Sequence, residues 1–597
     1  MNPMVAVTLV LQVALPSAVP PESAEAYRRA ARRAEAQYES LARHLAPRSW
    51  GGGWSQPCDE VVGRFCLRYE DDTGGSRPIA PEAERVIRAR QEAIEALRKA
   101  LAAMPDDFET AGPLVRYLIE DRRADEAVSA AELFAWATPD SAWGNLLHAF
   151  ALHAAGRDSA AERYFAEGLA RLDPETRQRF TRVDFLLAPP ERRRYRDLSE
   201  QERAEYEARL WTLADPLYLT PGNESWAEHL ARQIWARLLA RAPRVLGMHS
   251  WARDLDELTT RYGVPVARER IISTSIYHDE FRLVERYDTA ALAYVPEALH
   301  TRGFPRTPLP DDPWELDDPR ARSGYAPITF RRLVPLVHQV SRFPAGDSVV
   351  LRVDGVFVLD SAASGATSVE AAFFVLDEAA HRVREPRETV QVRGDTAWLS
   401  FEVKLPAGQH VYSLETMEPE SRLAGRARYS VELEAPPASG PALSDVLVTF
   451  PFGRGTQPTG RDDPAVRPRA DLRIPNDGMI GIYAEAHDLR PDPDGTTRYR
   501  VELVVQRATP PPFPSRALRW LGERVGLSKP AQDPRLAWEA EGVAGEPAIL
   551  TVDLDLSALE PGLYALELAV TDLVTGTRRQ TERILRLTEP RRRAVTP

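Results

Sequence analysis

The side chains of this chain that could do chemistry are carboxylates and histidines near its middle. The closest grouping comprises Glu224, Glu228, His229, His249 and Asp254. Carboxylates and imidazoles are the usual general acids and bases of enzymes, so a cleft lined by these groups could transfer protons. The same residue types also cap helices and pair with arginines, and we favour that structural interpretation here.

Other sequence motifs for catalysis or metal binding are incomplete. The eleven histidines include no HExxH pair, and His148 and His153 are five residues apart and diverge around a helix. Glu297-x-x-His300 has no second pair to complete a metal site. Residues 455–462 have a spacing similar to a P-loop but lack its Lys and Ser/Thr, and neither GxSxG nor GxGxxG is present. We therefore assign no catalytic residue, no metal ligand and no cofactor.

Two cysteines, Cys58 and Cys66, are the full complement of the chain. An even count with a short loop predicts a local disulfide in an oxidising compartment, with two free thiols as the alternative. The apolar run from Met4 to Leu15, followed by small residues up to Ala18, predicts a signal peptide, although no Lys or Arg precedes it. A buried strand or helix start is the alternative. Export to the periplasm or outside the cell is the expectation, with no transmembrane span after cleavage.

Composition limits the domain number and the partners. A chain of 597 residues is too long for one core. The apolar fraction of 43% and charged fraction of 27% are ordinary for a globular protein. A net charge of -12 disfavours nucleic acid, which rewards a basic face. The expected partner is a protein or a component of the cell envelope.

The first half has helical periodicity. Apolar stripes predict helices from Ser23 to Leu45 and from Pro81 to about Met104. Ser199 and Glu202 form a capping box that opens a further helix. Residues 149–174 resemble the second helix of a tetratricopeptide repeat, with a small residue and an aromatic one four apart and a closing Asp-Pro. Since fewer than three clear repeats are present, we expect a small domain of helical hairpins that is stabilised by packing against neighbouring parts of the chain.

A motif at the centre of the chain resembles the bacterial GWxTD domain family. The matching residues are Leu210-Trp211, Asp215-Pro216, Asn223-Glu224, Trp251-x-x-Asp254 and Tyr262-Gly263-x-Pro265. The family's glycine is Ser250 here and its threonine is Arg253, so this copy is divergent. The resemblance implies an α+β fold and a bacterial envelope context, and it implies no reaction.

The motif residues have structural interpretations. Asn223 and Glu224 are expected to cap a helix, and Trp251 to bury its ring. Asp254 is expected to cap a helix or to pair with Arg261, Arg268 or Arg270. Gly263 is expected to provide an unusual dihedral in a tight turn that ends at Pro265.

Beyond Thr329 the periodicity changes to two, and Gly/Pro turns separate the strands, which predicts antiparallel sandwiches. Leu405-Pro-Ala-Gly408 and Leu559-Glu-Pro-Gly562 each precede an aromatic strand, so we expect two immunoglobulin-like units. The fold class is therefore multidomain α+β. The expected segments are a signal peptide (1–18), a helix with the cysteine loop (19–78), helical hairpins (79–209), a GWxTD-like domain with a long loop (210–327) and two sandwiches (328–436 and 442–590).

Two functional hypotheses follow. The first is an exported bacterial envelope protein that binds or scaffolds other proteins without catalysis. The alternative is an uncharacterised enzyme with a site at the GWxTD-like segment.

Export can be tested in the native host. Fractionation is expected to recover the protein outside the cytoplasm, shortened at its N-terminus, with Cys58 and Cys66 alkylated only after reduction. Recovery of the full-length chain from the cytoplasm with both thiols reduced would contradict the export hypothesis.

Overall fold

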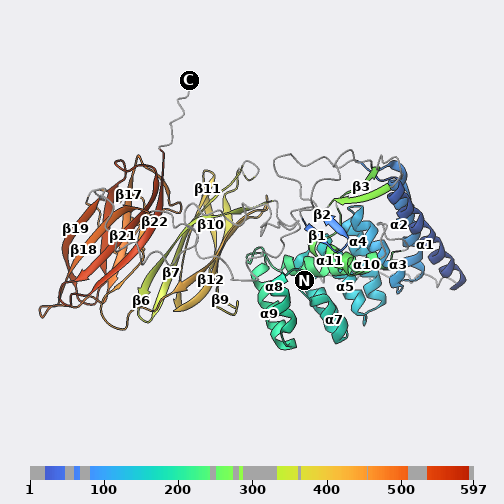
Figure 1. Cartoon of the computed structure of the whole chain (residues 1–597), viewed down its shortest axis with the longest axis horizontal. Helices are drawn as coiled ribbons and strands as arrows, with labels where there is room; N and C mark the ends of the chain where they lie inside the picture. Colours follow the sequence, from blue (N-terminus) through green and yellow to red (C-terminus); the bar gives the residue numbers. More distant parts are fainter. Residues whose placement is uncertain are drawn as a thin grey trace, which may run out of the picture. The chain divides into compact units, whose positions relative to one another are not determined.

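The computed structural model describes a helical part followed by a strand-rich part, as the sequence predicts (Figure 1). The described residues are 21–47, 60–67, 81–187, 189–242, 251–265, 267–272, 281–286, 332–360, 363, 365–453, 455–508 and 534–589. Contacts divide the chain into a helical unit and a β unit. The helical unit contains Met1–Glu207 and Pro221–Tyr294, and the β unit contains Ala208–Thr220 and Val295–Pro597. Residues 208–220 therefore belong to the β unit, although the strands of that unit come much later in the sequence.

Eleven helices lie in the described residues. They are α1 (Pro21–His44), α2 (Glu84–Ala103), α3 (Phe108–Glu120), α4 (Ala124–Ala137), α5 (Ala142–Ala154), α6 (Asp158–Arg171), α7 (Pro174–Thr181), α8 (Pro189–Asp197), α9 (Glu200–Ala214), α10 (Glu224–Ala240) and α11 (Arg253–Tyr262). Two hairpins accompany them, formed by β1 (Glu60–Val62) with β2 (Phe65–Leu67), and by β3 (Ala267–Ile272) with β4 (Phe281–Arg286). The division between the two units passes through α9.

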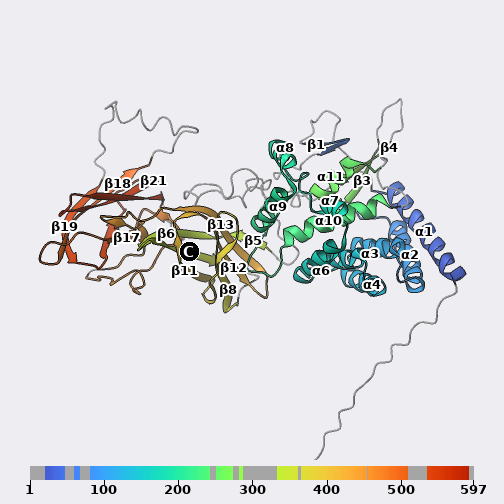
Figure 2. The ribbon, with the colours of Figure 1, turned by 90° about the horizontal axis from the view of Figure 1, so that it is seen from below.

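The helical unit has one large apolar core. Each helix from α1 to α6 packs against the next, and α10 packs against α3, α5, α6, α7 and α11 (Figures 1 and 2). The stripes predicted for the first two helices face this core, with Tyr38 of α1 and Leu97 of α2 almost fully buried. Burial of such a stripe supplies most of a helix's stability in water.

Local sequence signals set several helix ends. The predicted capping box opens α9: Ser199 Oγ accepts from the Glu202 N–H, and the Ser199 N–H donates to the Glu202 carboxylate at 2.8 Å. Asp173 accepts from the Thr176 N–H at 2.9 Å ahead of Pro174, the first residue of α7. These side chains satisfy N–H groups that a helix start leaves without an intrahelical acceptor.

The first nine strands of the β unit form one nine-stranded sheet around a shared core, which is called the first sandwich below. They are β5 (Arg332–Pro335), β6 (Val337–Ala345), β7 (Ser348–Val358), β8 (Ser368–Leu376), β9 (Arg382–Arg384), β10 (Arg387–Arg393), β11 (Thr396–Pro406), β12 (Gly408–Glu418) and β13 (Leu423–Leu433). The strand order is β5-β13-β12-β8-β10-β11-β7-β6, with β9 beside β8. Strand β10 pairs first with β8 and then with β11, so it joins the two halves. Side chains of both halves share one core, in which Phe373 of β8 stacks on Phe401 of β11.

A second sandwich completes the unit. Its strands are β14 (Ala442–Leu443), β15 (Leu447–Thr449), β16 (Arg473–Pro475), β17 (Met479–His487), β18 (Thr496–Arg507), β19 (Arg535–Val543), β20 (Ala548–Asp555), β21 (Gly562–Asp572) and β22 (Arg578–Thr588). One sheet has β17 between β14/β15 and β20, and the other has the order β16-β22-β21-β18-β19. Their inward-facing side chains form a separate core.

The two sandwiches have similar strand arrangements. In each, a long strand (β7 or β17) pairs with an earlier strand (β6, or β14 and β15) and with a later one (β11 or β20). In each, a short early strand pairs in parallel with the last strand (β5 with β13, β16 with β22). Gly408 and Gly562 occupy the same place in the two matching sequence motifs. They are the first residues of the equivalent strands β12 and β21, and both have positive φ.

The contact between the sandwiches is both apolar and polar. Phe343 and Val350 of the first pack with Leu447, Val466 and Tyr483 of the second. The Gln339 amide donates to the Val448 carbonyl at 3.0 Å and accepts from the Val448 N–H at 2.8 Å. These residues form a buried contact between the two sandwiches. Among the described helices of the whole chain, none combines the length and apolar composition that crossing a bilayer requires.

Candidate functional site

The GWxTD-like residues are divided between the two units. Trp211 and Asp215 lie in the piece that belongs to the β unit, whereas the residues from Asn223 onward lie in the helical unit. Of the suggested polar cleft, His249 lies outside the described residues. Cys58 also lies outside them, so the disulfide with Cys66 stays a prediction, as does the signal peptide of residues 1–18.

The Asp215 segment is held on the first sandwich by a buried arginine of β13, Arg428. This guanidinium donates to the carbonyls of Asp215 at 2.6 Å and Leu213 at 3.1 Å. It also donates to the Glu415 carboxylate of β12 at 2.7 Å and lies 3.7 Å from the centre of the Tyr218 ring. The Arg428 and Glu415 side chains have no solvent exposure. A buried charge needs such complete pairing, so this cluster is structural.

Further bonds extend the attachment along the segment. The second Glu415 oxygen accepts from the Leu219 N–H at 2.9 Å, and Arg426 donates to the Pro216 carbonyl at 2.7 Å. Burial raises the pKa of Asp215 to about 7, against the lowering effect of Arg428, and the Glu415 charge raises it further. The Asp215 carboxylate also accepts from the Leu217 N–H, as in an Asx turn.

Asn223 caps α10 as expected, because its side-chain oxygen accepts from the Trp226 N–H at 2.9 Å. Glu224 is buried in the first turn of the same helix. His229, a member of the suggested cleft, hydrogen-bonds the Phe180 carbonyl at 3.0 Å. Burial lowers the pKa of His229 to about 4, so the imidazole is neutral near pH 7 and donates to that carbonyl. It is a core histidine.

Asp254 has a partner that the sequence did not indicate. Arg64, in the turn between β1 and β2, donates to both Asp254 oxygens, at 2.6 and 2.8 Å. These bonds lower the pKa of Asp254 to about 2. We expected Arg261, Arg268 or Arg270 because they are near in sequence. The bidentate pair instead joins α11 to the hairpin that carries Cys66, 190 residues away.

Trp251 and Gly263 lie at opposite ends of α11. The half-buried Trp251 ring donates its Nε1–H to Asp256 at 2.8 Å and packs on the small core that contains Leu255, Leu258 and Tyr262. Gly263 ends the helix with a φ of +73°, a conformation that a β-carbon disfavours, as expected for this turn. Pro265 follows it.

His153, which we considered only for its spacing from His148, has two ionisable partners in the structure. His153 of α5 lies between two carboxylates, 2.7 Å from Asp158 and 2.8 Å from Glu228. Glu228 also accepts from Arg232 at 2.6 Å, and Arg232 donates to the Arg261 carbonyl at 2.6 Å. No local signal marks this cluster, because its members come from the end of α5, the start of α6, α10 and α11.

The electrostatics of the cluster fix its protonation. Burial alone would lower the pKa of His153, but the bonds to Asp158 and Glu228 raise it to about 10. Burial opposes ionisation of Glu228 as well, yet Arg232 and His153 hold its pKa well below the usual range. At neutral pH the charges are therefore fixed, and His153 is a poor general base. Across the described residues, no three His, Cys, Asp or Glu side chains form a group that could hold a metal.

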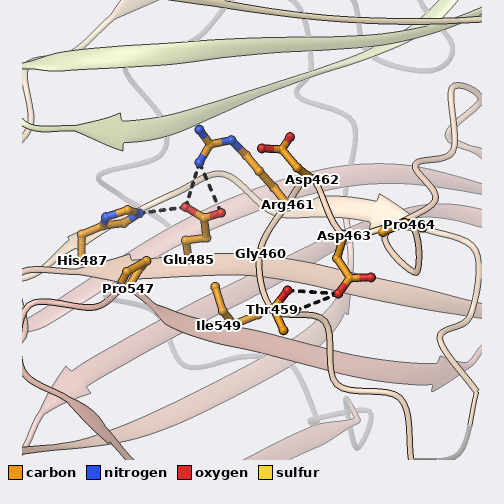
Figure 3. Close-up of a pocket in the computed structure, with 10 residues that line it drawn as sticks. All are labelled: Thr459, Gly460, Arg461, Asp462, Asp463, Pro464, Glu485, His487, Pro547 and Ile549. Carbon is orange, nitrogen blue, oxygen red and sulfur yellow. Dashed lines mark hydrogen bonds and ion pairs between the residues drawn. The ribbon is translucent and has the colours of Figure 1, made fainter.

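An open hollow of about 530 Å³ lies on the second sandwich, under the loop of residues 459–464. Figure 3 shows Arg461 and His487 directed at Glu485, while Thr459 bonds Asp463. Burial raises the pKa of Glu485, but the bonds from His487 and Tyr483 and the charge of Arg461 lower it overall. This carboxylate is already occupied by protein donors, so the hollow offers no assembled catalytic set.

Comparison with models of known protein families and with curated proteins finds no match for this chain.

Replacing Arg428 tests the buried cluster. Arg428→Met is expected to destabilise the β unit by about 3–5 kcal/mol, since Glu415 would stay buried without its partner. Arg387→Met is the matched control: this half-exposed arginine donates to the Leu219 carbonyl of the same segment at 3.3 Å, and its loss is expected to cost under about 1 kcal/mol. Urea unfolding measures both, and equal losses would contradict the assignment.

The His153 cluster predicts a pH dependence for the helical unit. Since the folded pKa is raised to about 10, the stabilisation is complete below the unfolded value of about 6.5 and is lost as pH rises toward 10. The depressed pKa of Glu228 makes its own contribution decline as pH falls below about 4.5. His153→Gln is expected to abolish the alkaline decline, measured by urea unfolding across pH. His148→Gln, one turn earlier and with a pKa lowered by burial, is expected to leave it unchanged.

Proposed function

We propose that this chain is an exported bacterial envelope protein that binds another protein or an envelope component without catalysing a reaction. It is a divergent member of the GWxTD domain family in this proposal. The main support for this proposal is that the polar side chains of the motif bond to other parts of the protein. Asp254 pairs with Arg64, Asn223 caps α10, and the Asp215 carboxylate accepts from the Leu217 N–H, so each has a structural partner within the chain.

The helical unit supports the tetratricopeptide-like part of the proposal. On α6, Ala161 and Phe165 are four apart and fully buried. Gly168 lies so close to α5 that a β-carbon there would come within 2.7 Å of Leu146. Close packing of a small residue and an aromatic one against the preceding helix is what such a repeat requires. Helical-hairpin arrays commonly present surfaces for polypeptides.

The β unit supports the immunoglobulin-like part. In both sandwiches a long strand (β7 or β17) lies between earlier and later strands, and a short strand (β5 or β16) runs parallel to the last one. That repeated arrangement, together with the matching glycine that begins β12 and β21, fits two copies of one immunoglobulin-like domain. Such domains serve mostly as spacers or binding modules, and the fold alone assigns no chemistry.

The helical unit also exposes an apolar face suited to a partner. Leu133 and Trp136 are three residues apart on α4, so they share one side of the helix. Trp136 is 71% exposed and Leu133 is 39% exposed. Tryptophan is among the residues most enriched at the energetic centres of protein interfaces. We infer that this face of α4 contacts the partner.

A photo-crosslinking amino acid at position 136 tests the proposal in the native host. A crosslink to one protein of the envelope fraction is expected, and Leu133→Ser is expected to weaken binding of that protein about tenfold, as for loss of part of a hot spot. Position 398 is the matched control, since Trp398 is 49% exposed on β11 of the other unit. Crosslinks that are absent from position 136, or equally strong from both positions, would contradict the proposal.

A further inference from the structure

A second hollow lies within the helical unit and is suited to a small ligand. It has a volume of about 350 Å³, at the lower end of the range typical of small-molecule sites. Its wall combines residues of α1, α3 and the end of α10: Arg32, Glu35, Phe108, Glu109, Pro113, Arg116, Leu238, Arg241 and Ala242. Leu133 and Trp136 are not among them, so this site is separate from the exposed face of α4.

Two buried ionisable side chains in this wall have unused hydrogen-bonding atoms. Arg116 is 2% exposed and donates from one Nη to Glu39 at 2.5 Å. Its other Nη has no hydrogen-bond acceptor among the described residues, while its Nε lies 3.8 Å from the Glu120 carboxylate. Glu35 Oε1, in a residue 3% exposed, likewise has no hydrogen-bond partner there. Buried polar atoms in folded proteins are nearly always paired, so these atoms point to a ligand.

The helix geometry adds an acceptor and an apolar surface. Pro113 lies inside α3 and has no N–H, so the Glu109 carbonyl four residues earlier does not receive the usual helix bond. Phe108, Pro113 and Leu238 line the same hollow with carbon atoms. A ligand that fits would therefore have a polar head and an apolar body.

The charged residues that line the hollow indicate whether the polar head of the ligand is an anion or a cation. Three arginines line the hollow, against the two carboxyl groups of Glu35 and Glu109. Arg32 and Arg241 are exposed at the surface, and Arg241 lies 3.5 Å from the Glu109 carboxylate and 5.2 Å from the Phe108 ring centre. Arg116 is already offset by Glu39 and Arg241 by Glu109, so the third arginine, Arg32, supplies the charge that favours an anion. The unused Nη of Arg116 has N–H groups that an oxygen of a carboxylate can accept.

We propose that this hollow binds a small organic carboxylate with an apolar chain. The carboxylate accepts from the unused Nη of Arg116. Glu35, in its acid form, donates its proton to the same carboxylate. The apolar chain packs on Phe108, Pro113 and Leu238.

Ligand binding in this hollow would change the protonation of Glu35. Burial raises the pKa of Glu35 to about 7, and the Arg116 charge lowers it while the Glu39 charge raises it. The ionisable groups near Glu35 come from α1, α3 and the end of α10; they are Arg32, Glu39, Glu109, Arg116, Tyr117 and Arg241. An arriving carboxylate adds a negative charge and stabilises the acid form. Binding near neutral pH is therefore coupled to uptake of a proton by Glu35.

Titration calorimetry of the full chain with hexanoate tests this site. Hexanoate is expected to bind at about pH 6 and to bind about tenfold more weakly at about pH 8, since the acid form of Glu35 falls from roughly nine-tenths to one-tenth. Runs at pH 7 in two buffers of different ionisation enthalpy are expected to show proton uptake. Hexylammonium is the matched cationic probe and is expected not to bind.

Two variants and a control separate this site from non-specific binding. Glu35→Gln keeps a donor at every pH, so it is expected to bind hexanoate equally at both pH values without proton uptake. Arg116→Gln is expected to weaken binding at least about tenfold. Glu25→Gln, an exposed carboxyl on the same helix, is expected to behave as wild type. Lack of hexanoate binding at pH 6, preferential binding of hexylammonium, or a tenfold pH effect that persists in Glu35→Gln would overturn the proposal.

Discussion

The burial of the Arg428 guanidinium is the constraint on which the β unit's attachment to residues 208–220 depends. An arginine cannot lose its proton to escape the cost of burial, so it must be surrounded by acceptors. The sheet supplies Glu415 and Ser413, and the segment supplies two backbone carbonyls. Neither the sheet nor the segment alone provides a complete set. The hydrogen bonds of Arg428 can form only when residues 208–220 lie at one position on the strands. Apolar contacts alone would allow more positions.

The helical unit uses charge in the same way at its centre. His153 is held between Asp158 and Glu228, and Arg232 connects Glu228 to the last turn of α11. Helices α5, α6, α10 and α11 thus meet at one chain of hydrogen bonds within the core of the helical unit. Buried atoms without a hydrogen-bond partner among the described residues occur at Arg116 and Glu35 and also at the second oxygen of Asp158. The Arg116 and Glu35 atoms differ in that they belong to side chains that line a hollow of about 350 Å³.

Local features of the fold could be predicted from the sequence, and distant pairings could not. The helix stripes, the capping box at Ser199, the Asn223 cap and the Gly263 turn depend on residues within a few positions of each other. The alternation of the second half likewise indicated strands. The partner of Asp254 could not be found, because Arg64 is 190 residues away in a hairpin without a distinctive pattern. His153 was discounted for the same reason: its spacing from His148 says nothing of Glu228, which is 75 residues later.

The 213 residues that separate Asp215 from Arg428 also set an order in time. During synthesis the segment leaves the ribosome long before β12 and β13, and at about 5–20 residues per second the wait is roughly 10–40 s. Meanwhile the intervening residues 221–294 belong to the other unit and can fold with the helices already made. The final closure therefore joins the ends of a very long loop, the slowest kind of contact to form. A nascent chain interrupted before residue 428 would have formed its helices but would lack Arg428, the cation that holds residues 208–220 on the sheet.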